Sequence, residues 1–157
     1  MSDYRKLIDN IQILSRTVNL TTDLIVGFPM ETQTDEQATL ALINENLFLD
    51  IHTFSYSLRK GTIAAQMDQI PTAIVGERMN KVLSAIVLAK KSILASFHGQ
   101  AARVLVESTH NERTAGYTDG YVKVELSAQN LQPNQFIDVI LDKPILIGKE
   151  WGMSRLR

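Results

Sequence analysis

The chain has 157 residues, of which 45% are hydrophobic and 21% charged, a composition typical of one ordinary globular domain or two small ones. It contains no cysteine, which excludes disulfides, thiolate zinc sites and cysteine-held iron–sulfur clusters within these residues. The net charge of −1 favours neither nucleic acid nor a membrane surface. Since the sequence has no long apolar run and no apolar signal core, we expect a cytoplasmic protein without a membrane segment.

The first third of the sequence predicts alternating helices and strands. Apolar residues recur at helical spacing over 3–15, whereas "LTTDLIV" (20–26) and "LFLDIHTFSY" (47–56) are short runs typical of strands. Between these runs, Thr34 and Gln37 match a capping box at the start of a second helix. Helix–strand–helix–strand is the order of right-handed βα units that build a parallel sheet.

The middle of the chain predicts a loop and then one long helix. Residues 57–71 have the Gly, Pro and polar content of a loop, and 72–98 form the longest segment with helical periodicity, which ends at Gly99. Residues 71–98 hold four Lys or Arg and one acidic residue, the only basic surplus in the chain. This basic side is either a solvated surface or an RNA-binding face. Its charged residues are Glu77, Arg78, Lys81, Lys90 and Lys91.

After Gly99 the hydrophobic period changes from 3.6 to 2. The alternating segments are "ARVLVE" (102–107), "YVKVEL" (121–126) and "FIDVIL" (136–141), and "ILI" follows Pro144. Asp119-Gly120 and the segments "LQPN" and "LDKP" are turn signals. Several short strands within so few residues predict a small antiparallel barrel.

Ligand sites of parallel α/β folds lie at the carboxyl ends of the strands, which directs attention to "VGFPMET" after the first strand. Gly27 allows close approach of a backbone or ligand, and Phe28-Pro29 stiffens the exit of the strand. Glu31 either accepts hydrogen bonds from a ligand or stabilises the next helix. Asp23, a carboxylate within a β-branched strand, either faces a polar lumen or is paired structurally.

The end of the second strand is also polar. Ser57, Arg59, Gly61 and Thr62 can present hydroxyls, a guanidinium and a flexible backbone to an anionic ligand. His52 has no second histidine or carboxylate at metal spacing, which favours a core or supporting role over metal ligation. The sequence has no phosphate loop, no Gly-x-Gly-x-x-Gly and no Gly-x-Ser-x-Gly.

Four segments occur in the order of one known family. They are "TTDLIVGFPMET", "IHTFSYSLRKGTIAAQM", "GYTDGYVKVEL" and "NQFIDVIL", with the basic helix between the second and the third. The chain resembles the C-terminal part of the radical-SAM methylthiotransferases that modify tRNA, from about residue 3 to residue 144. The last two segments resemble most the branch that acts on N6-threonylcarbamoyladenosine beside the anticodon. "GKEWGMSRLR" at 148–157 matches no part of the family that we can place.

The resemblance implies a domain order. Residues 1–70 would form the C-terminal end of a partial radical-SAM β/α barrel, 71–98 a connecting helix, and 99–157 an all-β, OB-like RNA-binding domain called TRAM. Whole enzymes of the family use S-adenosylmethionine and two [4Fe–4S] clusters to add a methylthio group at C2 of the modified adenosine. No catalytic residue and no metal ligand is expected in the part that this chain resembles.

The resemblance also implies roles for individual residues. The tip of the penultimate barrel strand packs against the adenosine of S-adenosylmethionine, so this contact would involve Ile25, Gly27 and Phe28, and Ser57 would close the same site. Asp23 and Arg59 would make polar contacts on the substrate side. Single-stranded RNA is bound by aromatic and cationic side chains, which here are Tyr117, Tyr121, Lys123 and Arg113. The two tyrosines can also simply cover the sheet.

The chain departs from the family pattern at several positions. Met30 stands where Gly is common, and the prolines usual at Leu58, Lys60 and Ile63 are absent. The cluster cysteines lie in a part of the family that is not represented here, so we expect this chain to be inactive by itself. tRNA, and a separate chain that carries the cluster domains, are the expected partners. The alternatives are a stand-alone RNA-binding module and an inactive truncated or split-gene product.

Overall fold

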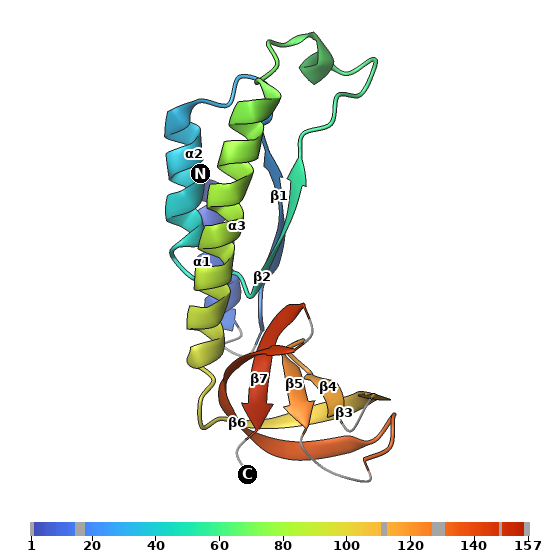
Figure 1. Ribbon diagram of the computed structural model, residues 1–157. Coiled ribbons are helices and arrows are strands. Elements are labelled where there is room, and N and C mark those ends of the chain that lie inside the picture. Colours follow the sequence, from blue (N-terminus) through green and yellow to red (C-terminus); the bar gives the residue numbers. More distant parts are fainter. Residues whose placement is uncertain (1, 15–17, 111–112, 127–130, 148, 156–157) are drawn as a thin grey trace. The chain divides into compact units, whose positions relative to one another are not determined.

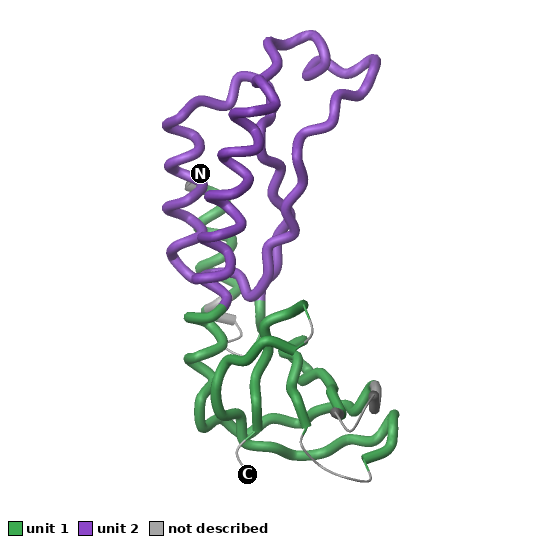
Figure 2. Tube along the Cα trace, viewed as in Figure 1, with its two compact units in different colours: residues 1–19, 91–157 green, residues 20–90 purple. Residues whose placement is uncertain are grey.

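The computed structural model describes residues 2–14, 18–110, 113–126, 131–147 and 149–155. It divides into two compact units, one of residues 1–19 with 91–157 and one of residues 20–90 (Figure 2). The expected boundaries near 70 and 98 refer to the domains of the resembled family and stay a prediction. Within the described ranges, no helix is both long and apolar enough to cross a membrane.

The N-terminal part follows the expected order of helices and strands. Helix α1 spans Ser2–Leu14, and strand β1 spans Thr21–Val26. Helix α2, Gln33–Ile43, connects β1 to strand β2, Asp50–Ser55. The two strands pair in parallel, with Thr21 opposite Asp50 and Val26 opposite Ser55. The mixed α/β character expected from the sequence is therefore confirmed.

The N-cap of helix α2 lies two residues before the expected one. Thr32 has extended backbone (φ −90, ψ 171), and its hydroxyl accepts a hydrogen bond from the Asp35 amide at 3.2 Å. The Asp35 carboxylate in turn accepts one from the Thr32 amide at 2.9 Å. The expected capping box of Thr34 and Gln37 is wrong, because both residues already lie inside the helix.

Helix α3, Thr72–Ala95, follows a loop that contains one short 3₁₀ helix, Ile63–Gln66. Helices α2 and α3 lie on the same side of the β1–β2 sheet (Figure 1). The buried α3 side chains Val82, Ile86 and Ala89 recur at helical spacing. They form the apolar stripe that the sequence predicts.

The C-terminal part is a β domain of five strands. They are β3 (Ala101–His110), β4 (Arg113–Thr118), β5 (Lys123–Leu126), β6 (Phe136–Ile147) and β7 (Glu150–Arg155). They pair in the order β3-β4-β5-β7-β6, and β3 also pairs with β6, so the sheet closes on itself. Strand β7 is absent from the sequence prediction, yet it completes the ring by pairing with β5 in parallel and with β6 in antiparallel fashion.

The interior of this β domain is filled by small and branched apolar side chains. Val104, Val106, Val124, Leu126 and Met153 have no exposed surface. The expected inward alternation of "YVKVEL" is therefore confirmed. A small β domain is present, and its assignment as a TRAM domain stays a prediction.

Two glycines let neighbouring strands of the β domain approach closely. A side chain at Gly116 would collide with the backbone carbonyl of Leu105 in β3. A Cβ at Gly152 would lie 2.5 Å from the carbonyl oxygen of Lys123 in β5. Both positions therefore require glycine for packing and not for an unusual backbone angle.

Candidate functional site

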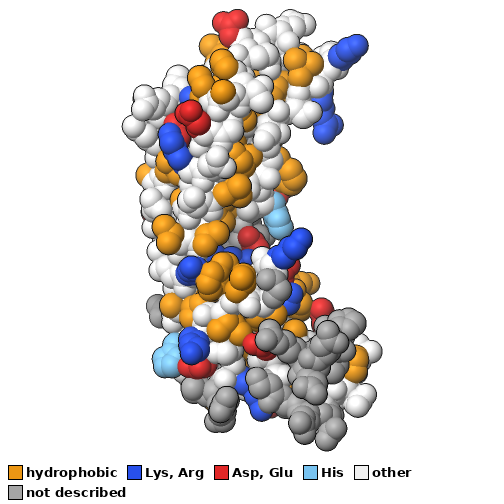
Figure 3. All heavy atoms as spheres, viewed as in Figure 1, with side chains coloured by type: hydrophobic (Ala, Val, Ile, Leu, Met, Phe, Trp, Pro, Cys, Tyr) orange, Lys and Arg blue, Asp and Glu red, His pale blue; other side chains and the backbone are white. Residues whose placement is uncertain are grey.

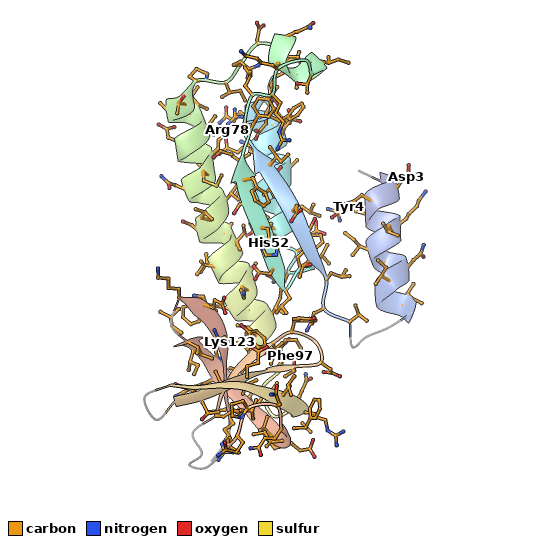
Figure 4. All side chains as sticks on the ribbon, turned by 90° about the vertical axis from the view of Figure 1, so that its right-hand side faces the viewer. Asp3, Tyr4, His52, Arg78, Phe97 and Lys123 are labelled. Atoms are coloured by element: carbon orange, nitrogen blue, oxygen red, sulfur yellow. The ribbon has the colours of Figure 1, made fainter. Side chains whose placement is uncertain are left out.

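One face of the β1–β2 sheet has exposed side chains. Asp23 lies opposite His52, and Ile25 lies opposite Phe54, so these four residues share one face, which we call the open sheet face. Ile25 is 53% exposed and Phe54 54% exposed. Val26 and Ile51 are buried on the sheet. Figure 4 shows His52 on this sheet.

The carboxyl end of β1 extends the open sheet face with aromatic rings. Phe28 is 44% exposed, and its ring meets the Tyr56 ring edge-on, with centroids 5.3 Å apart and planes at 76°. The Tyr56 amide donates to the Val26 carbonyl at 2.9 Å, which fixes the residue just beyond β2 beside the end of β1. Of the expected residues, Asp23 and Ile25 thus lie on the open sheet face, and Phe28 lies just beyond the carboxyl end of β1.

The turn after β1 is held together internally. Gly27 has a φ of +77°, and a Cβ there would lie 2.6 Å from the Val75 side chain on α3. Its amide donates to the Glu31 carboxylate at 2.6 Å, and the Glu31 amide donates to the Phe28 carbonyl at 3.0 Å. Of the two interpretations of Glu31, the structure favours the structural one. Gly27 is required for packing, and its contact with a cofactor stays a prediction.

A buried arginine connects this turn to both helices. Arg78 of α3 is 8% exposed and donates to the Glu31 carbonyl at 3.0 Å. Its guanidinium lies 3.4 Å from the Glu31 carboxylate and 3.7 Å from that of Glu36, which also pairs with Lys81 at 2.8 Å. Figure 4 shows Arg78 near the end of the sheet where this turn lies. The arginine braces the turn from which Phe28 projects.

The basic side of α3 is engaged in contacts within the chain, and whether it also contacts RNA stays a prediction. Arg78 and Lys81 contact the glutamates above, and Lys90 forms an ion pair with Asp50 at 2.7 Å. The Lys91 ammonium lies 4.0 Å from the centroid of the Trp151 ring. The signal for these contacts was present in the sequence, because residues 1–70 hold nine acidic residues against five basic ones. Three of these acidic residues, Glu31, Glu36 and Asp50, pair with basic residues of α3.

The other expected residues of the α/β part lie in exposed chain. Ser57 and Arg59 follow β2 and have exposed side chains. The Arg59 carbonyl accepts hydrogen bonds from the amide and the hydroxyl of Thr62, at 3.3 and 2.9 Å, so this loop has a defined turn. Met30 adopts a φ of 67° and is 67% exposed. Hydrophobic side chains recur along residues 20–90 in the view of Figure 3.

In the β domain, two of the expected RNA-binding residues are neighbours. Tyr117 of β4 pairs in register with Lys123 of β5, and both side chains reach Glu150 of β7. The Tyr117 hydroxyl donates to the Glu150 carboxylate at 3.2 Å, and the Lys123 ammonium donates to the same oxygen at 3.0 Å. The ammonium also lies 5.7 Å from the Tyr117 ring centroid. We call these three residues the Glu150 cluster.

The cluster shifts the proton affinities of its members. The hydrogen bond to Glu150 raises the pKa of Lys123 above its ordinary value, against the opposing effect of burial. Burial, followed by the charge of Glu150, raises the pKa of Tyr117. Lys123 is therefore firmly protonated at neutral pH, with its charge directed at a carboxylate.

Tyr121 is held in an unusual conformation. Its φ is 60°, in the left-handed region, and it is 82% exposed. Its amide donates to the Thr118 carbonyl at 3.0 Å, and the next amide, that of Val122, donates to the Thr118 hydroxyl at 3.0 Å. The Asn19 side chain donates to the carbonyl of Gly120 at 2.7 Å. The turn thus presents an aromatic ring to solvent two residues before Lys123 in the sequence.

Arg113, the fourth residue expected to contact RNA, lies in a strand. It opens β4 and pairs with His110 at the end of β3. The side chain of Arg113 lies outside the described residues, so its contact with RNA stays a prediction. Among the described side chains, no three His, Asp or Glu residues gather as a metal-binding group.

Comparison with known proteins points to enzymes that modify tRNA. No family model matches the chain. A curated relative from Geobacillus thermodenitrificans is 34% identical over 158 residues, and one from Bacillus pumilus is 36% identical over 157 residues. These alignments cover 97% and 96% of this chain but 29% and 30% of the relatives. One from Lachnoclostridium phytofermentans is 39% identical over 111 residues, covering 70% of this chain and 24% of the relative.

All three relatives bear one name, tRNA-2-methylthio-N(6)-dimethylallyladenosine synthase. The similarity supports the methylthiotransferase class that the sequence segments resemble. It does not support the branch expected from them, because the relatives are named for dimethylallyladenosine and not for threonylcarbamoyladenosine. The chain spans less than a third of the length of these relatives.

Proposed function

We propose that this chain is part of a tRNA methylthiotransferase, in which it supplies a portion of the S-adenosylmethionine site and the RNA-docking domain. The observation that carries the proposal is similarity over 97% of the chain to a tRNA-2-methylthio-N(6)-dimethylallyladenosine synthase. The open sheet face and the exposed Tyr121 supply surfaces for the two tasks.

The open sheet face fits the adenosine of S-adenosylmethionine. Ile25 and Phe54 present apolar surface at the carboxyl end of two parallel strands, where such folds bind ligands. Asp23 and His52 add polar groups beside them, which can meet the ribose hydroxyls. When bound, S-adenosylmethionine supplies the transferable methyl group, and these residues hold its nucleoside part and exclude water from it.

The residues do not fit an iron–sulfur cluster. Such clusters are held by cysteine thiolates, and the sequence contains none. Cluster chemistry therefore depends on residues outside these 157, in the same protein or in a partner chain. A stand-alone RNA-binding module is the second candidate function, and the same missing thiolates favour it.

The substrate adenosine follows the names of the relatives. We propose tRNA carrying N6-dimethylallyladenosine as the substrate of the whole enzyme, because the three relatives are named for it. The threonylcarbamoyl branch, favoured by the segments "GYTDGYVKVE" and "NQFIDVIL", is the competing assignment. Comparing the chain's affinity for anticodon stem-loops with either modification separates the two assignments.

The RNA-docking part is tested by tRNA binding at low and at physiological salt. We expect salt-sensitive tRNA binding that both variants weaken. Tyr121→Ala removes a stacking contact with a base, and Lys123→Ala removes a contact with a phosphate. Lys143→Ala is the control, since Lys143 is an exposed lysine of the β domain outside the Glu150 cluster. Absence of tRNA binding at low salt would sink this part of the proposal.

The cofactor part is tested by saturation-transfer NMR with S-adenosylmethionine at millimolar concentration. We expect magnetisation transfer to the adenine protons, lost in Ile25→Asp and retained in Leu88→Asp. Leu88 is an equally apolar side chain, 67% exposed on α3, which makes it a fair control. The proposed cofactor role would be wrong if both variants reduced the magnetisation transfer equally. It would also be wrong if the parent chain showed no transfer. tRNA binding without transfer would select the RNA-binding module.

A further inference from the structure

We propose that Glu150 occupies the place of an RNA phosphate in the Glu150 cluster, and thereby makes the β domain selective for RNA that can displace it. The inference rests on the proposed RNA-docking function and adds a selectivity residue to it. The ligand chemistry is the ribose-phosphate backbone of a single strand whose neighbouring base stacks on Tyr121.

The geometry of the cluster is that of a filled anion site. One Glu150 oxygen accepts from both the Lys123 ammonium, at 3.0 Å, and the Tyr117 hydroxyl, at 3.2 Å. A cation and a hydroxyl that converge on one oxygen are the donors that bind a phosphate oxygen equally well. The Glu150 side chain is 56% exposed, whereas that of Lys123 is 23% exposed. The carboxylate is therefore the more accessible of the two groups to a competing anion.

The position of the cluster connects it to the exposed ring of Tyr121. Tyr121 precedes Lys123 by two residues, and the left-handed backbone at Tyr121 directs its side chain into solvent. Glu150 begins β7, which lies next to β5 in the sheet. In the proposed complex, a nucleotide stacked on Tyr121 belongs to the strand whose phosphate replaces Glu150 at the Lys123 ammonium, two residues further along the chain.

Competition between carboxylate and phosphate produces selectivity. Every RNA that binds Lys123 must first break its contact with Glu150 and then tolerate the nearby negative charge. RNA with a correctly placed base regains this free energy by stacking, whereas an arbitrary strand does not. The raised pKa of Lys123 is consistent with a strong contact to Glu150. The equal number of basic and acidic residues in 99–157, seven each, gives this segment no net positive charge to attract RNA without selection.

The experiment uses the full chain with Glu150→Gln, which keeps the size of the side chain and removes its charge. The control is Glu107→Gln, which removes the same charge from an exposed position on β3. Binding of unmodified tRNA and of a short oligouridine is measured by fluorescence anisotropy across a salt series. Circular dichroism confirms that both variants are folded.

We expect Glu150→Gln to bind oligouridine about three- to tenfold more tightly at low salt, as expected for freeing one surface cation and removing one repulsion. The salt dependence should steepen by about 0.7 in log–log slope, the value for one additional phosphate contact on a single strand. The gain for tRNA should be smaller, so the preference for tRNA falls. In a Lys123→Ala background, Glu150→Gln should change affinity no more than Glu107→Gln does.

Two results would overturn the inference while leaving RNA docking intact. One is tRNA and oligouridine binding that Glu150→Gln leaves unchanged or weakens, since Glu150 would then orient Lys123 and not compete for it. The other is an equal gain from Glu107→Gln, which would indicate bulk charge. If neither the parent chain nor Glu150→Gln binds any RNA, both the docking function and the inference fail. Binding by Glu150→Gln alone supports the inference in its strongest form.

Discussion

The left-handed backbone of Tyr121 gives opposite predictions for stability and for RNA binding. We consider Tyr121→Gly, which removes the ring and also the Cβ that makes this conformation unfavourable. A non-glycine residue in the left-handed region costs about 1–2 kcal/mol. Glycine loses more entropy on folding, about 0.5–1 kcal/mol. Because Tyr121 is 82% exposed, little packing is lost with its ring.

The net expectation is that Tyr121→Gly stabilises the β domain by about 0.5–1 kcal/mol, which raises its melting temperature by about 2–8 °C. Tyr121→Ala keeps the strained conformation and should melt close to the parent chain. Thermal unfolding is followed by the fluorescence of Trp151, the only tryptophan in the sequence. Both variants should bind tRNA more weakly, by about five- to one-hundredfold, the effect of one lost stacking contact.

The pair of variants separates function from packing. A ring that merely covers the sheet would leave tRNA affinity unchanged in both. A Tyr121→Gly variant that melts below the parent would show that the tyrosine stabilises the turn, and the argument from backbone strain would be wrong. The combination of higher stability and weaker binding is expected only if the strain is retained for display of the ring.

The remaining predictions concern the supports of the site. Arg78→Met should destabilise the α/β part by about 3 kcal/mol in urea unfolding, because it removes a buried cation that pairs with Glu31 and leaves Glu36 with Lys81 alone, whereas the exposed Lys81→Met should cost less than about 1 kcal/mol; equal costs would refute the buried brace. Thr32→Ala should lower helix stability by about 1 kcal/mol in thermal unfolding, and Thr34→Ala should not; the reverse order would reinstate the cap expected from the sequence. The folded-state pKa of Lys123 is raised, so its stabilising contribution is complete below the ordinary value of 10.5 and is lost as the pH rises above it. The thermal unfolding midpoint of the parent chain should therefore fall when the pH is raised from below 10.5 to above it. The same change of pH should lower the midpoint of Lys123→Met by less.

The parts of the fold with a regular hydrophobic period were predictable from the sequence. The runs that became β1 and β2 are short and bounded by turn residues, and "YVKVEL" alternates strictly. Strand β7 was missed because "EWGMSR" has no alternation, and Gly152 and Met153 are both buried although they are adjacent. Only pairing with two neighbouring strands makes this segment a strand.

The candidate site was predictable where it depends on exposed side chains at strand ends. Ile25 and Phe28 lie where parallel strands place ligands, and the register with Phe54 follows from the pairing. Arg78 was assigned to the solvent side because helical periodicity places charged residues there. Its burial depends on two acidic partners far away in the sequence, and a local pattern contains no information about them. The same holds for Glu150, which only the closure of the β domain brings to Lys123.

The close approach of strands at Gly116 and Gly152 restricts which amino-acid replacements the protein tolerates at these two positions. At both codons, every amino-acid replacement adds a Cβ, and that atom meets a backbone carbonyl, which cannot rotate away as a side chain can. No single compensating substitution elsewhere can remove a backbone atom. A saturation library should therefore contain no tolerated missense variant at either codon, while Gly61 and Gly99, whose surroundings are open, accept the residues that their positive φ angles permit.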